Sequence, residues 1–105
     1  MPTTAEVYVM FQVANLVRQF GLRAHQHDAD LRYVNADKDP DKEGFYMLDF
    51  HGIPGNGDDE VSRKMREINR LLGADENGKV KVHDIDELED RIDYALSVAP
   101  RPRIR

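Results

Sequence analysis

The chain has 105 residues, of which 40% are hydrophobic and 33% are charged, with a net charge of −5 and no cysteine. Its length and composition predict a single compact domain over residues 1–105, in which only residues 100–105 form a loose basic tail. The net negative charge argues against direct nucleic-acid binding, which needs clustered Lys and Arg, and the lack of cysteine excludes disulfides, thiolate metal ligands and a thiol nucleophile.

The N-terminal region does not have the features of a targeting or membrane segment. Its sequence, MPTTAEVYVMFQVANL, has no basic leader, and the polar residues Gln12, Asn15 and Arg18 interrupt the apolar residues before they reach a bilayer-spanning length. We therefore expect a cytoplasmic protein that does not associate with membranes.

A first helix is predicted over residues 4–20. Thr3 and Glu6 have the spacing of a capping box, in which each side chain accepts from the other residue's backbone amide. The residues that follow have apolar side chains on one broad arc and polar ones opposite, so one side should be buried. Gly21 comes directly after, where glycine tolerates the left-handed conformation that ends a helix. The predicted apolar arc comprises Val9, Met10, Val13, Ala14, Leu16, Val17 and Phe20.

Three short strands are predicted next, over residues 22–27, 31–36 and 45–50, because the hydrophobic period changes from 3.6 to 2 after Gly21. We interpret them as an antiparallel meander. The segment 45–50 is the most apolar, which favours a central position in the sheet. If Leu48 and its alternate neighbours face the core, the carboxylate of Asp49 faces water.

A second helix is predicted over residues 59–72, capped by Asp58 or Asp59 and closed by Gly73. Its apolar stripe consists of Val61, Met65, Ile68 and Leu72.

A fourth strand over residues 79–83 follows the turn-forming pair Asn77 and Gly78. A third helix over residues 85–98 then begins at Asp84, with Glu87 completing a second capping box, and Pro100 prevents its continuation. The order α-β-β-β-α-β-α predicts an α+β two-layer sandwich with a mainly antiparallel sheet, and the second helix suggests a parallel crossover to the fourth strand. The expected core comprises Val13, Leu16, Leu48, Phe50, Ile68, Leu72, Ile92 and Leu96.

The four histidines suggest one catalytic hypothesis, because all of them fall at predicted strand ends. His25, His27, His51 and His83 are the candidate metal ligands. Imidazoles from a His-x-His pair, a third histidine and a carboxylate would suit zinc with an open position for water, as in a small metal-dependent hydrolase or nuclease. The spacing matches no tight ligand signature, and a polar or hydrogen-bonded structural role explains the same residues. We therefore expect no cofactor.

The distribution of charge favours a non-enzymatic protein-interaction module, a regulator or inhibitor that docks on a basic surface of a larger protein or assembly. Residues 37–60 contain eight acids and two lysines, and the outer side of the third helix is also acidic, whereas Arg63, Arg66 and Arg70 lie on the outer side of the second helix. Tyr8, Phe11 or Tyr94 would supply an aromatic anchor. The expected partner-binding residues are Asp86, Glu87, Asp90, Asp93 and Tyr94.

Overall fold

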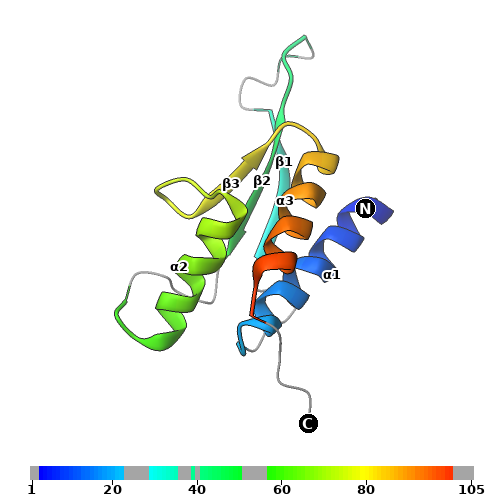
Figure 1. Ribbon diagram of the computed structural model, residues 1–105. Helices are drawn as coiled ribbons and strands as arrows, with labels where there is room; N and C mark the ends of the chain where they lie inside the picture. Colours follow the sequence, from blue (N-terminus) through cyan, green and yellow to red (C-terminus); the bar gives the residue numbers. More distant parts are fainter. Residues whose placement is uncertain (1–2, 23–28, 36–38, 40, 51–56, 101–105) are drawn as a thin grey trace.

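The computed structural model describes residues 3–22, 29–35, 39, 41–50 and 57–100. The α+β class and the antiparallel sheet are confirmed (Figure 1). The described elements are α1 (Thr4–Gln19), β1 (Ala29–Val34), β2 (Phe45–Phe50), α2 (Glu60–Leu72), β3 (Lys79–Val82) and α3 (Ile85–Val98). Their order matches the predicted one except for the strand over residues 22–27, which lies outside the described residues beyond Leu22.

The first helix begins and ends where the local sequence predicts. The amide of Glu6 donates to the Thr3 hydroxyl at 3.1 Å, and the amide of Thr3 donates to the Glu6 carboxylate at 3.3 Å, so the capping box is complete. Gly21 has a φ of 78°, the left-handed conformation expected after the last turn. The predicted apolar arc is buried except for Met10, which is half-buried.

The sheet has the order β1-β2-β3, so the predicted central position of Phe45–Phe50 is confirmed. β1 begins and ends two residues earlier than predicted, because its register against β2 pairs Ala29 with Phe50 and Val34 with Phe45. On β2, Leu48 faces the helices and is fully buried, and Asp49 lies on the opposite face between Asp30 and Lys79 on the neighbouring strands.

The predicted parallel crossover between the third and fourth strands is wrong, because β2 and β3 pair antiparallel. Asp49, near the end of β2, lies opposite Lys79, the first residue of β3. The chain between them, which includes α2, therefore leaves and re-enters the sheet at the same end of the strands. A parallel pair would require a connection that crosses to the opposite end of the strands. The turn after α2 produces this return: the Asp75 carboxylate accepts the amides of Asn77 and Lys79, and Gly78 has a φ of 75°.

The core lies between the sheet and the three helices, and α1 packs chiefly against α3. Phe50 and Leu96, which we expected in the core, are only half-buried at its margin. On α2 the predicted stripe is rotated slightly, since Val61 is 40% exposed and the neighbouring Ser62 is buried instead. The largest fully buried side chains are Leu16, Leu48, Met65, Ile68, Leu72, Leu88 and Ile92.

Candidate functional site

The acidic side of α3 is exposed, as the helical periodicity predicts. Asp86, Asp90 and Asp93 are spaced four and three residues apart, so they lie along one side of the helix, and all three are exposed. Tyr94 lies one turn after Asp90 and is 59% exposed, the largest value among the exposed large hydrophobic side chains of the described residues. These four side chains, which we call the α3 acidic face, combine negative charge with an exposed aromatic ring.

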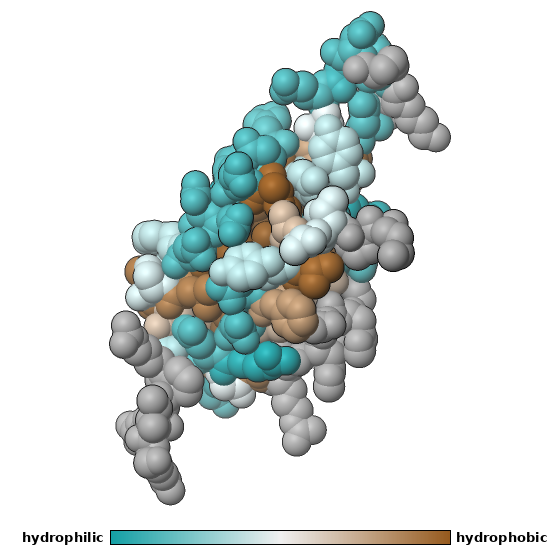
Figure 2. All heavy atoms as spheres, turned by 90° about the vertical axis from the view of Figure 1, so that its right-hand side faces the viewer, coloured by the Kyte–Doolittle hydropathy of each residue, from teal (hydrophilic) through white to brown (hydrophobic). Residues whose placement is uncertain are grey.

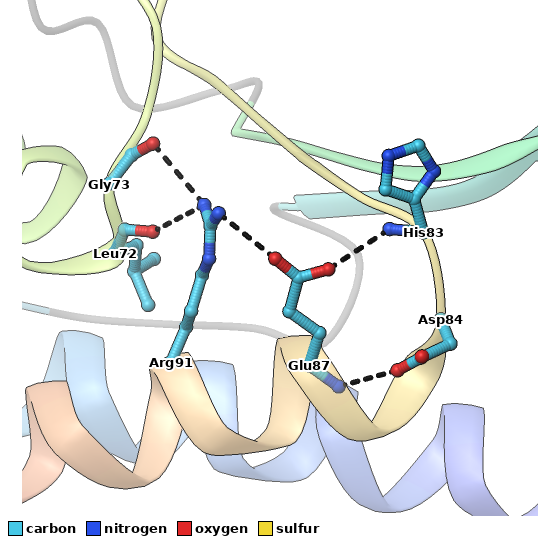
Figure 3. A network of polar contacts seen from close by, with 6 residues as sticks. All are labelled: Leu72, Gly73, His83, Asp84, Glu87 and Arg91. Carbon is cyan, nitrogen blue, oxygen red and sulfur yellow. Dashed lines mark hydrogen bonds and ion pairs between the residues drawn. The ribbon is translucent and has the colours of Figure 1, made fainter.

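Glu87 differs from the other predicted partner-binding residues because its carboxylate already has partners within the chain (Figure 3). One oxygen accepts the backbone amide of His83 at 3.2 Å, and the other accepts from the guanidinium of Arg91, also at 3.2 Å. The amide that Glu87 accepts therefore belongs to His83, one residue before the position expected for a capping box. Asp84 caps the helix by accepting the Glu87 amide at 2.7 Å.

Arg91 joins the acidic helix to the end of α2. Its other terminal nitrogen donates to the carbonyl oxygens of Leu72 and Gly73 at 3.3 Å and 3.4 Å (Figure 3). The last carbonyls of a helix have no partner within the helix and carry partial negative charge, so a guanidinium there stabilises the helix end. Gly73 makes this end possible by adopting a φ of 74°. The network of Glu87 and Arg91 thus holds the α3 acidic face in a fixed position relative to α2.

A shallow groove of about 310 Å³ runs between α2 and α3 beside Tyr94. Leu71 supplies an apolar, half-buried part of its lining. Arg70 lies on the α2 side of the groove, whereas the α3 side contains the two acids Glu87 and Asp90 together with Arg91. The hydrogen bond from Arg70 to Glu67 raises the pKa of the guanidinium, which therefore stays charged over the whole accessible pH range.

The basic side of α2 is used partly for internal contacts. Arg66 donates to the carbonyl of Gly57 at 2.6 Å, and Arg70 is paired with Glu67, while Arg63 is exposed. Of these three arginines, only Arg70 contributes to the lining of the groove, to which Asp90 of α3 also contributes.

The histidine hypothesis falls largely outside the described residues. His25, His27 and His51 belong to undescribed segments, and His83 is exposed after the end of β3. Within the segments that are described, no three His, Asp or Glu side chains lie together as a metal site.

Sequence reasoning missed Arg91 and Leu71. The spacing of Arg91 four residues after Glu87 is a recognisable signal for their ion pair. Its contacts with the end of α2 depend on how two distant helices pack, and no local pattern predicts them. The expected aromatic anchors Tyr8 and Phe11 are exposed, and they lie on α1, a different helix from the one that carries the α3 acidic face.

Comparisons with protein-family models, with curated proteins and with solved structures each returned no match. In the part of the chain that the structure describes, none of the helices is both long and apolar enough to cross a bilayer. We therefore infer the function from the geometry of the α3 acidic face and the groove beside it.

Proposed function

We propose that the protein is a non-enzymatic interaction module of the cytoplasm that regulates a larger protein or assembly, as an inhibitor for example, by docking its α3 acidic face on a basic surface. The observation that carries this proposal is the position of Tyr94, which is 59% exposed beside three exposed aspartates on a helix held by internal contacts. An aromatic side chain buries a large area for little loss of conformational entropy, which makes it a suitable anchor.

The surrounding charges suit a basic partner. Asp86, Asp90 and Asp93 are free of the network that binds Glu87, so they are available to attract and orient cationic side chains. Long-range attraction of this kind raises the association rate and is screened over a Debye length of about 8 Å at physiological salt.

The shape of the site also favours docking over catalysis. The groove is open and shallow, and Tyr94 is part of its lining. Catalytic pockets generally enclose most of a small substrate among converging polar groups. A shallow groove beside an exposed aromatic ring better suits a protruding side chain of another protein.

The experiment is capture of partners from an extract of the native cells on immobilised protein, followed by kinetic measurement with the purified partner. The test variants are the triple reversal Asp86→Lys, Asp90→Lys, Asp93→Lys and, separately, Tyr94→Ala. The triple reversal should slow association, and Tyr94→Ala should weaken affinity by about thirtyfold or more, which corresponds to about 2 kcal/mol. Higher salt should weaken binding by the unaltered protein.

A matched control separates position from net charge. The triple reversal Asp41→Lys, Glu43→Lys, Glu76→Lys changes the net charge by the same amount at exposed residues distant in sequence from α3. It should retain most of the affinity. If both triple variants lose binding equally, or if Tyr94→Ala binds normally, the α3 acidic face is not the docking site.

A further inference from the structure

A second pocket, of about 530 Å³, lies where the end of β2 meets α2 and the turn that leads to β3 (Figure 1). Its volume falls within the range of about 300–1,000 Å³ that is typical of small-molecule sites. It is a different site from the groove between α2 and α3, although Arg70 borders both. The lining residues are Asp49 and Phe50 of β2, Arg66, Asn69 and Arg70 of α2, and residues 74–78 of the turn.

The charged groups that line this pocket are separated by sign. Among the described residues, the lining cations Arg66 and Arg70 both belong to α2. The lining acids, Asp49, Asp75 and Glu76, belong to the end of β2 and to the turn. One wall of the pocket is therefore cationic and the other is anionic. A molecule that is complementary to both walls carries a negative and a positive group.

Two of the three acids have no partner within the described part of the chain. Asp75 accepts the amides of Asn77 and Lys79, so its carboxylate holds the turn together. The carboxylates of Asp49 and Glu76 make no hydrogen bond or ion pair with the described residues. These two side chains can therefore accept from a cationic group of a ligand.

The cationic wall can accept a carboxylate although Arg70 already has a partner. The Arg70 guanidinium is paired with Glu67, and both side chains are largely exposed. Exposed ion pairs contribute little free energy, so this pair does not prevent a second contact. A guanidinium has five N–H donors, and its planar shape matches the two oxygens of a carboxylate.

Asn69 adds an unsatisfied amide between the two walls. Its Oδ1 is buried and accepts no hydrogen bond from the described residues. Such a group calls for a donor, and rotation about the broad terminal torsion of asparagine turns the oxygen towards a ligand. A Cβ at residue 78 would lie 3.6 Å from Nδ2 of Asn69, so Gly78 leaves the space beside this amide open.

The chemistry of this pocket differs from that of the side on which α1 lies, where Figure 2 shows an apolar band between hydrophilic surfaces. Apolar lining is limited here to Phe50 and Ala74, which are half-buried, and to the backbone of Gly78. The ligand should accordingly be mainly polar, with room for one apolar side chain.

We propose that this pocket binds a short free peptide, such as a dipeptide. Its carboxylate lies against Arg66 and Arg70, its ammonium group lies against Asp49 and Glu76, and its peptide group pairs with the Asn69 amide. A peptide group has one N–H donor and one carbonyl acceptor, as a side-chain amide requires.

The combination of three groups selects this class of ligand. A free amino acid has both charges but no peptide group, and the end of a protein chain has only one of the two charged termini. A dipeptide has all three groups within one small molecule. This inference goes beyond the proposed function and does not depend on it, because the α3 acidic face does not line the pocket.

Titration of the full chain with the dipeptide alanyl-leucine, followed by NMR of the backbone amides, tests the proposal. The leucine side chain is chosen to contact Phe50 and Ala74. We expect a dissociation constant of about 1 mM, with shifts concentrated at Phe50, Asn69 and the turn residues 74–78. The N-acetylated dipeptide, the C-terminal amide and free leucine each lack one of the three groups. Each should bind at least about tenfold more weakly, as expected for the loss of a hydrogen bond to a charged or buried group.

Asn69→Leu removes the amide and keeps a similar volume. It should weaken binding of alanyl-leucine at least about tenfold without lowering the melting temperature, because Oδ1 has no partner in the unliganded chain. Glu76→Gln, at an exposed residue of the turn, should also weaken binding. Glu43→Gln is the matched control, since it makes the same change at an exposed residue that precedes β2 and lies outside the pocket.

Circular dichroism checks that each variant is folded, and Glu76→Gln keeps the test decisive if Asn69→Leu does not fold. Three results would each overturn the proposal. They are no shift at these residues with about 10 mM alanyl-leucine, equal binding of the dipeptide and the three probes that lack a group, and unchanged affinity in both Asn69→Leu and Glu76→Gln.

Discussion

The hydroxyl of Tyr33 accepts the backbone amide of Gly44 at 3.0 Å, and its ring lies directly over that glycine. A Cβ at residue 44 would approach the Tyr33 ring to 2.7 Å and the carbonyl oxygen of Val34 to 2.6 Å. The same ring meets Tyr46 edge to face at a centroid distance of 5.1 Å. The start of β2 is therefore fixed against the end of β1 by an aromatic contact that only glycine accommodates.

Gly44→Ala should consequently destabilise the protein by about 1–3 kcal/mol, the usual cost of overpacking at a site that cannot relax freely. Chemical denaturation monitored by circular dichroism measures this. Glu43→Ala, at an exposed neighbour, should change stability by less than about 0.5 kcal/mol. Equal stability of the two variants would show that the Tyr33 ring moves aside.

Substitutions on α2 test which side of that helix is buried. Leu72→Ala should lower the free energy of unfolding by about 2–5 kcal/mol, because Leu72 is fully buried and its truncation leaves a cavity. Val61→Ala should cost less than about 0.5 kcal/mol, since Val61 is 40% exposed. Thermal and denaturant unfolding of both variants measures these losses of stability. Similar losses in the two variants would show that the buried side of α2 is assigned wrongly.

The sequence predicted the helix ends well because the signals are local. Thr3 with Glu6, Asp59 and Gly73 act within a few residues of the backbone groups that they satisfy. Val61 was misplaced for a related reason: Ser62 follows the cap, and its hydroxyl donates to the Asp59 carboxylate at 2.7 Å. Because this contact satisfies its hydroxyl group, Ser62 can occupy a buried position although it is polar.

Sheet topology and the groove were harder to predict because they depend on contacts between distant residues. The direction of β3 follows from the turn around Asp75, which returns the chain to the end of β2. Helical periodicity correctly placed Asp86 and Tyr94 on the exposed side of α3. The hydrogen bond between Glu87 and Arg91 and the one from Arg91 to Gly73 could be identified only from the way the helices pack in the structure.

The cap of α2 should make stability depend on pH. Hydrogen bonds from the Ser62 side chain and backbone lower the pKa of Asp59 below its ordinary value of 3.8. As the pH falls through that value, the unfolded chain takes up a proton before the folded one, so this contribution is present above the ordinary pKa and is lost as the pH falls through the folded pKa. Asp75, whose pKa is also lowered, acts in the same direction.

Asp59→Asn tests this effect, because asparagine keeps the cap but does not titrate. The decrease in melting temperature between about pH 5 and about pH 2 should be shallower in this variant than in the unaltered protein. Asp58→Asn removes the adjacent carboxylate, which does not cap the helix, and should leave the slope closer to that of the unaltered protein. Identical slopes in all three proteins would contradict a role for Asp59.

The histidines give a prediction of a different kind. Because their spacing lacks a tight ligand signature, we expect protein purified without chelator or histidine tag to contain well below one equivalent of zinc by elemental analysis. The double variant His25→Ala, His27→Ala should therefore have the same metal content. A stoichiometric ion that this variant loses would restore the metal-dependent hydrolase or nuclease hypothesis.

Arg91→Met tests the network that holds α3 against α2. Methionine retains much of the apolar stem, but it leaves the carbonyls of Leu72 and Gly73 and the Glu87 carboxylate without the guanidinium. Since these groups are partly solvated, the loss of stability should be modest, about 1 kcal/mol. Amide hydrogen exchange should accelerate at the last turn of α2, where the capping contact is lost.

Arg63→Met changes the same residue type at an exposed position on α2 and should affect neither the stability nor the exchange rate. Unchanged exchange at the end of α2 in Arg91→Met would mean that helix packing alone positions the α3 acidic face.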